Sequence, residues 1–152
     1  MEYTEVFKKR SFILRLNDGE ILHEEVEKFA QMKNITHGNV SIIGGIDKGS
    51  ILVVGPENGR AEKIIPMIYK IEDVCEATGT GTLIPDKEGT PILHMHISAG
   101  RNEKTVTGCI REGVKVWLVM EVVIEEWTNC GALRLKDPAT GFKLLNANPE
   151  KT

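Results

Sequence analysis

The segment from Val114 to Ile124 constrains the fold of this chain more than any other stretch of its sequence. Apolar side chains occupy every second position, at Val114, Val116, Leu118, Met120, Val122 and Ile124. Because the side chains of a strand alternate between two faces, this pattern predicts a long β-strand with one buried face. The other face mixes charged residues with three apolar ones, Trp117, Val119 and Val123. A strand that is apolar on both faces needs cover on both, and a second subunit can supply one of them.

The remaining sequence predicts one helix among further strands. Residues Glu20 to Lys33 carry apolar side chains at helical spacing, and we expect Asn34 to end that helix. The spacing predicts strands at residues 11–16, 39–43, 50–54, 64–71, 75–83, 91–98, 105–110 and 132–135. Residues 44–49 are expected to join two of these strands in a hairpin. The sequence therefore predicts one α+β domain over residues 1–145, followed by a loose tail at residues 146–152.

Two histidines one residue apart, His94 and His96, lie in one of the predicted strands. Period-two alternation places both imidazoles on the same face of that strand. Neutral imidazoles on one rigid face are a common beginning of a transition-metal site. The pair therefore predicts a site for zinc or a similar transition metal ion. The alternative interpretation is that both histidines are ordinary polar strand residues.

Cys109 is the candidate third ligand. If the hairpin that follows His96 is symmetric about Arg101 and Asn102, Cys109 pairs with His94 and shares its face. Three protein ligands with an open fourth position are typical of catalytic zinc, whereas structural zinc normally has four. A slip of one residue would instead send Cys109 to the opposite face, where it would be a small buried apolar residue.

Charge and composition limit the classes of function. The chain has 19 Lys and Arg against 22 Asp and Glu, and its one basic triplet is Lys8-Lys9-Arg10. Strong binding of duplex DNA needs clustered cations, so we expect none from this domain alone. No apolar run is long enough to span a membrane, and no signal peptide is recognisable. The 3 cysteines are widely separated, as in a cytoplasmic protein with reduced thiols.

Several segments together carry a resemblance to a known family. They are Leu14-Arg-Leu-Asn-Asp-Gly-Glu20, Ser41-Ile-Ile-Gly-Gly45, Leu93-His-Met-His-Ile-Ser98 and Thr107-Gly-Cys-Ile-Arg-Glu-Gly113. In order and spacing they resemble the plants-and-prokaryotes conserved (PPC) domain, also catalogued as the DUF296 family. The resemblance extends from about Phe12 to Leu135 and is closest to the stand-alone prokaryotic members.

The resemblance implies a compact α+β domain in which a mainly antiparallel sheet packs against a helix, and it implies a homotrimer. Some family members hold a metal on the His-x-His strand and on a histidine of the following Gly-His-Leu strand. His94 and His96 match this pattern, but Cys109 stands at the third position, so the chain departs from it. The DNA-binding description of the family belongs to plant members with an adjacent AT-hook, and this sequence has no such segment.

Two functions of different classes follow. The favoured one is a trimeric, metal-binding, PPC-like domain with an interaction or regulatory role and protein partners. The alternative is a small metal-dependent enzyme, a hydrolase or lyase that uses a metal-bound water. Glu76, Glu112 and Glu121 are its candidate general bases, although nothing in the sequence selects one of them.

Overall fold

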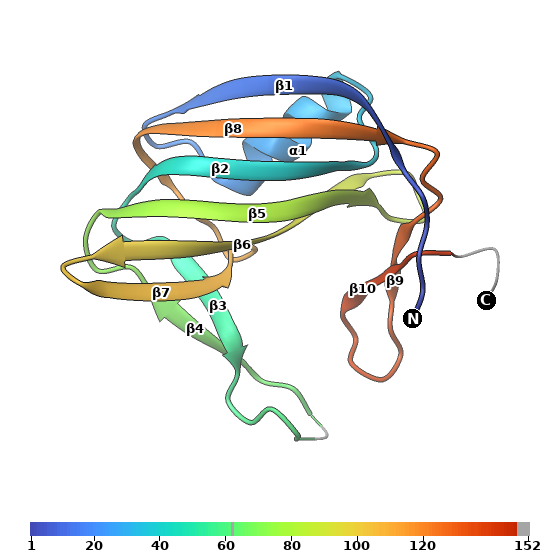
Figure 1. Ribbon diagram of the computed structural model, residues 1–152. Helices are drawn as coiled ribbons and strands as arrows, with labels where there is room; N and C mark the ends of the chain where they lie inside the picture. Colours follow the sequence, from blue (N-terminus) through green and yellow to red (C-terminus); the bar gives the residue numbers. More distant parts are fainter. Residues whose placement is uncertain (62, 149–152) are drawn as a thin grey trace.

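One large sheet and one helix make up most of the structure. The computed structural model describes residues 1–61 and 63–148. Its elements are β1 (Phe7–Asn17), α1 (Leu22–Met32), β2 (Gly38–Ile46), β3 (Ile51–Pro56), β4 (Pro66–Lys70), β5 (Cys75–Pro85), β6 (Pro91–Arg101), β7 (Lys104–Cys109), β8 (Val116–Thr128), β9 (Leu133–Lys136) and β10 (Lys143–Asn146). Eight strands form a sheet in the order β1-β8-β2-β5-β6-β7-β3-β4, and β9 and β10 form a separate hairpin (Figure 1). The strand pairs of the described residues are antiparallel, and with the helix α1 they confirm the predicted α+β fold.

The helix α1 forms where its apolar spacing predicts. Leu22, Val26 and Ala30 are buried against the sheet, within a core that includes Met95 and Met120. The helix ends as its sequence predicts, because Asn34 adopts a positive φ of 53° and the following amide donates back to the Ala30 carbonyl at 2.8 Å. Among the described residues, no helix lies on the opposite face of the sheet (Figure 1). None of the helices in the described residues is long and apolar enough to cross a membrane.

Strand β8 departs from the predicted alternation at one residue. Leu118 was expected on the buried face, but its side chain is 58% exposed and its φ is 58°. The cause is a bulge, because Gly44 pairs with Met120 while Gly45 pairs with Trp117. Leu118 and Val119 are the two residues of β8 without a partner in β2. Their insertion turns Leu118 outward and keeps the later apolar residues of β8 on the core face.

The prediction that residues 44–49 join two strands in a hairpin is wrong, because β2 and β3 do not pair. Gly44 and Gly45 lie inside β2, which pairs with β5 on one side and β8 on the other. The strand β3 follows β2 in sequence but lies between β7 and β4. Gly44 is required where β8 bulges, because its φ is 151° and an added Cβ would overlap the Val119 carbonyl oxygen.

The C-terminal segment contains more regular structure than expected. Strand β10 follows a turn at residues 137–141 and pairs with β9. The expected tail at residues 146–152 begins within β10, and residues 149–152 lie outside the described part of the chain.

Candidate metal centre

The neighbouring strands β6 and β7 position the three candidate ligands. Their turn is centred on Asn102 and Glu103, both with positive φ, rather than on Arg101 and Asn102 as expected. Cys109 therefore pairs with His96 and not with His94. The register differs from the prediction by two residues, an even shift, so Cys109 remains on the same face as both histidines.

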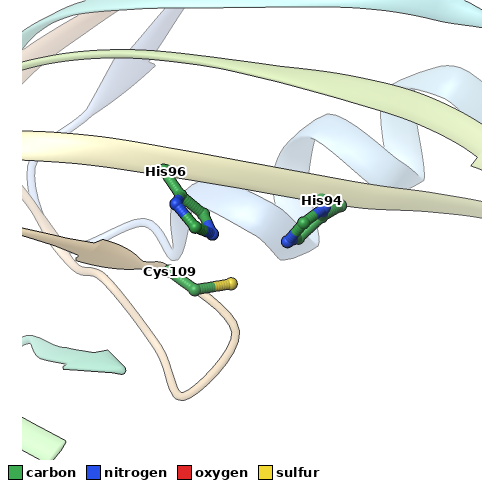
Figure 2. Close-up of side chains that lie close together, drawn as sticks. All are labelled: His94, His96 and Cys109. Carbon is green, nitrogen blue, oxygen red and sulfur yellow. The ribbon is translucent and has the colours of Figure 1, made fainter. Parts of the chain in front are cut away.

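The structure brings His94, His96 and Cys109 together on the helix-free face of the sheet. Figure 2 shows both imidazoles projecting from β6 toward the sulfur of Cys109. The imidazole nitrogens and the Cys109 Sγ all lie within 4.8 Å of one another. The two rings are 5.1 Å apart and nearly perpendicular. Cys109 is buried, His94 is half-buried and His96 is exposed, so the group is open to solvent on one side.

Both imidazoles have their nitrogens available. Within the part of the chain that the structure describes, neither His94 nor His96 forms a hydrogen bond with another protein group. By contrast, His37 is a structural histidine, because its Nε2 lies 2.8 Å from the Ala132 carbonyl oxygen and its Nδ1 lies 2.9 Å from the Thr36 hydroxyl. The two nitrogens of His37 are therefore already used.

The electrostatic surroundings favour neutral His94. Burial, followed by the positive charges of Arg134 and Arg111, lowers the pKa of His94 below its ordinary value. A neutral imidazole is the form that binds a metal, so His94 remains a competent ligand near neutral pH.

Two arginines adjoin the three candidate ligands. The Nε of Arg111 donates to the Cys109 Sγ at 3.4 Å. Arg134, on β9, donates from Nη2 to the Thr82 hydroxyl at 2.9 Å, and Thr82 pairs directly with His94. Neither arginine was predicted as a site residue. No sequence spacing could have found Arg134, because it reaches this face from a strand outside the main sheet.

The donor set fits a transition metal ion. Two imidazoles and one thiolate are zinc ligands, with bond lengths of about 2.0–2.3 Å and hence ligand atoms about 3.5 Å apart in a tetrahedral site. Modest side-chain rotations would reduce the separations of up to 4.8 Å to that range. The three glutamates considered as general bases, Glu76, Glu112 and Glu121, do not belong to this group of candidate ligands in the described residues.

Comparison with known sequences identifies the family to which this chain is similar. The family model of the Plants and Prokaryotes Conserved (PCC) domain matches residues 3–128. A curated relative, the bifunctional protein GlmU of Synechococcus sp. (strain JA-3-3Ab), is 26% identical over 140 residues. That match covers 90% of this chain but 20% of the relative, so this chain spans about a fifth of its length.

Solved structures share the fold. A metal-containing protein from Archaeoglobus fulgidus has a TM-score of 0.80 at 22% identity, covering 96% of this chain and 99% of that one. A plant- and prokaryote-conserved protein from Pyrococcus horikoshii has a TM-score of 0.81 at 20% identity, covering 96% and 97%. A protein from Bacteroides thetaiotaomicron, named as a candidate DNA-binding protein, has a TM-score of 0.73 at 19% identity and covers 94% and 98%.

Proposed function

This chain belongs to the Plants and Prokaryotes Conserved (PCC) domain family, and we propose that it is a metal-binding member whose metal site serves an interaction or regulatory role. His94, His96 and Cys109 are the ligands in this proposal, and zinc or a similar transition metal ion is the cofactor. Residues 1–145 form the single domain that carries the site. A metal held by three protein ligands retains an exchangeable position and acts there as a Lewis acid.

The observation that carries the proposal is the convergence of three metal-binding groups from two strands. Their ligand atoms lie within 4.8 Å of one another, and neither imidazole has another partner in the described residues. His37 is the contrasting case, because both of its ring nitrogens are satisfied by protein groups. The Archaeoglobus fulgidus protein, which shares the fold and contains a metal, supports the presence of a metal ion.

Elemental analysis tests this proposal directly. Protein purified without chelators and without a histidine tag should contain about one zinc-like ion per chain, because three ligands of this type hold transition metals tightly. Dialysis against a strong chelator should remove the ion, and one added equivalent should restore it. Absence of any stoichiometric metal before and after this addition would contradict the proposal.

The alternative function, a metal-dependent enzyme, can be judged from the groups that surround the three candidate ligands. Metal-dependent hydrolases and lyases commonly place a protein group beside the metal that accepts a proton from the attacking water. Arg111 and Arg134, which adjoin the site, are always protonated and cannot do so. Ligand binding is therefore favoured over activation of water.

We also propose that the chain assembles as a homotrimer. Strand β4 lies at one edge of the large sheet with every residue exposed, including Met67, Ile68 and Tyr69. On the helix-free face, Ile13 pairs with Val123, and both are exposed next to the exposed Ile43. Uncovered sheet edges and apolar surfaces are ordinarily protected by another chain.

Light scattering tests the assembly. At micromolar concentration the protein should have three times the 16.9 kDa mass of one chain. Replacing Ile68 with glutamate should reduce that mass, because it puts a charge on the exposed edge. Replacing the exposed Gln31 of helix α1 with glutamate also adds one negative charge, so it is the matched control and should leave the mass unchanged. A monomer for the unaltered chain would contradict the proposal.

Specific binding of duplex DNA is not part of the proposed role. The basic triplet is neutralised by ion pairs, because Lys8 contacts Glu125, whereas Lys9 and Arg10 both contact Glu126. Other cations are also paired with carboxylates, through the contacts Arg101–Asp73 and Lys115–Asp47. Paired cations are poorly placed to neutralise phosphates. We place the protein, with its reduced cysteines, in the cytoplasm.

A further inference from the structure

The two arginines beside the candidate metal ligands lack acidic partners. Among the ion pairs formed by the described residues, none includes Arg111 or Arg134. The chain has 22 Asp and Glu, so acidic residues are available elsewhere in the fold. A guanidinium removed from water ordinarily has a charged or hydrogen-bonding partner. Arg134 is buried without a carboxylate partner, and Arg111 also lacks one beside the same candidate ligands, so neither positive charge has a counter-charge in the described residues.

Arg134 is held in place but is only partly satisfied. Its residue surface is 7% exposed, and one terminal nitrogen donates to the Thr82 hydroxyl at 2.9 Å. Its Nε is buried and has no hydrogen-bond partner in the described structure. Thr82 pairs with His94, so this guanidinium is anchored beside the first candidate metal ligand.

Arg111 is on the Cys109 side of the group. Its Nε donates to the Cys109 Sγ, and its guanidinium lies 5.8 Å from the centre of the Phe142 ring. These contacts use one nitrogen and one face of the guanidinium. The terminal nitrogens remain available, and the side chain is exposed, so a ligand from solvent can reach it.

The candidate metal site and its two neighbouring arginines would together carry a net positive charge, which an anion can neutralise. A divalent metal bound by one thiolate and two neutral imidazoles retains one positive charge. The two guanidiniums raise the formal total to three positive charges. Burial first and then the charge of Arg111 lower the pKa of Arg134, because two positive charges so placed repel each other. An anionic ligand would relieve this repulsion.

We propose that Arg111 and Arg134 bind a small oxyanion, the carboxylate or phosphate group of a small molecule, next to the metal held by His94, His96 and Cys109. The inference rests on the proposed metal site and names the class of ligand that site takes. Guanidinium groups recognise such groups by charge-assisted, often paired, hydrogen bonds. The exchangeable position of a three-ligand metal accepts an oxygen of the same group.

Calorimetric titration tests the proposal with inorganic phosphate and acetate as separate probes, at constant ionic strength with chloride as the reference anion. Metal-loaded protein should bind at least one of the two probes, and tighter binding of phosphate or of acetate distinguishes a phosphoryl from a carboxylate ligand. Arg134→Gln and Arg111→Gln should each weaken that binding by at least about tenfold, because each removes a charge-assisted hydrogen bond.

Arg101→Gln is the matched control. Arg101 is an arginine of β6 that already pairs with Asp73 at 2.7 Å, so its loss should leave the anion affinity unchanged. Since Arg134 is buried, each variant is checked for its unfolding temperature and its metal content. Arg111 is exposed, and its variant tests the proposal even if Arg134→Gln is unstable.

The outcomes separate this inference from the proposed metal site. Arginine variants that keep their metal but lose the anion support the oxyanion site. Equal affinity in the unaltered protein and in both variants, or no binding by about 10 mM of either probe, would overturn it. If the unaltered chain holds no metal, the metal proposal fails, and the same titration of the metal-free chain still decides whether the arginines bind the anion.

Discussion

Replacing His96 with alanine should lower the zinc affinity of this protein by at least about 100-fold. Mutation of a residue that only supports a metal ligand costs about 10–100-fold, and removal of a ligand should cost more. His96 is exposed and forms no hydrogen bond with the described protein, so its truncation should leave the fold intact. The measurement is a competition titration against a chromophoric chelator, with circular dichroism as the check on folding.

Ser98→Ala is the matched control for that variant. Ser98 lies two residues further along β6 on the same face, and its hydroxyl contacts Thr107 rather than the candidate ligands. Its loss should leave the zinc affinity unchanged. A third variant, Cys109→His, is studied with cobalt as the probe metal. It should still bind cobalt, but it should lose the absorption band that arises from the bond between sulfur and cobalt. Zinc affinity that is unaltered by both His96→Ala and Cys109→Ser would contradict the assigned ligands.

Replacing Gly81 with alanine should destabilise the protein by about 3 kcal/mol, near the upper end of the range for inserting a methyl group into a packed core. Gly81 on β5 pairs with Met95 on β6. An added Cβ would lie 2.5 Å from the His94 carbonyl oxygen and 2.7 Å from the Met95 Cα, so the backbone of β6 would have to move. That strand carries both candidate imidazoles, so zinc affinity should fall as well. Chemical denaturation at a fixed protein concentration measures the change in free energy of unfolding.

Gly100→Ala is the matched control for Gly81→Ala. Gly100 is also a strand glycine, but an added Cβ would approach Thr105 only to 3.5 Å, an ordinary contact. Its effect should stay within about 1 kcal/mol. If the two variants were equally stable, the close approach of β5 to β6 would not be the reason for glycine at residue 81.

Local periodicity was sufficient for most secondary-structure elements. The helical spacing of Leu22, Val26 and Ala30 predicted α1, because one face of a helix must be buried against something. Alternation predicted β8 in the same way, except at Leu118. The bulge there arises from the pairing of β8 with β2, including the close approach at Gly44, and no property of β8 alone signals it.

Order within the sheet was not predictable from neighbouring segments. Strands β2 and β3 are consecutive, and a glycine-containing connection between them is typical of a hairpin. In the structure, β2 instead pairs with β5 and β8, which lie far away in sequence. Partners that are distant in sequence pair with both edges of this central strand, and that pairing is a property of the whole chain.

The candidate metal site was likewise predictable from the sequence only in part. The sequence by itself determined that His94 and His96 share a face, because strand side chains alternate with period two, and it kept Cys109 on that face because the error in register was even. Only the tertiary structure decided that Cys109 pairs with His96, and that Arg134 arrives from β9 beside Thr82. Periodicity fixes the side of a strand on which a residue lies. Which strand lies next to it depends on long-range packing, and Arg134 reaches the site through that packing.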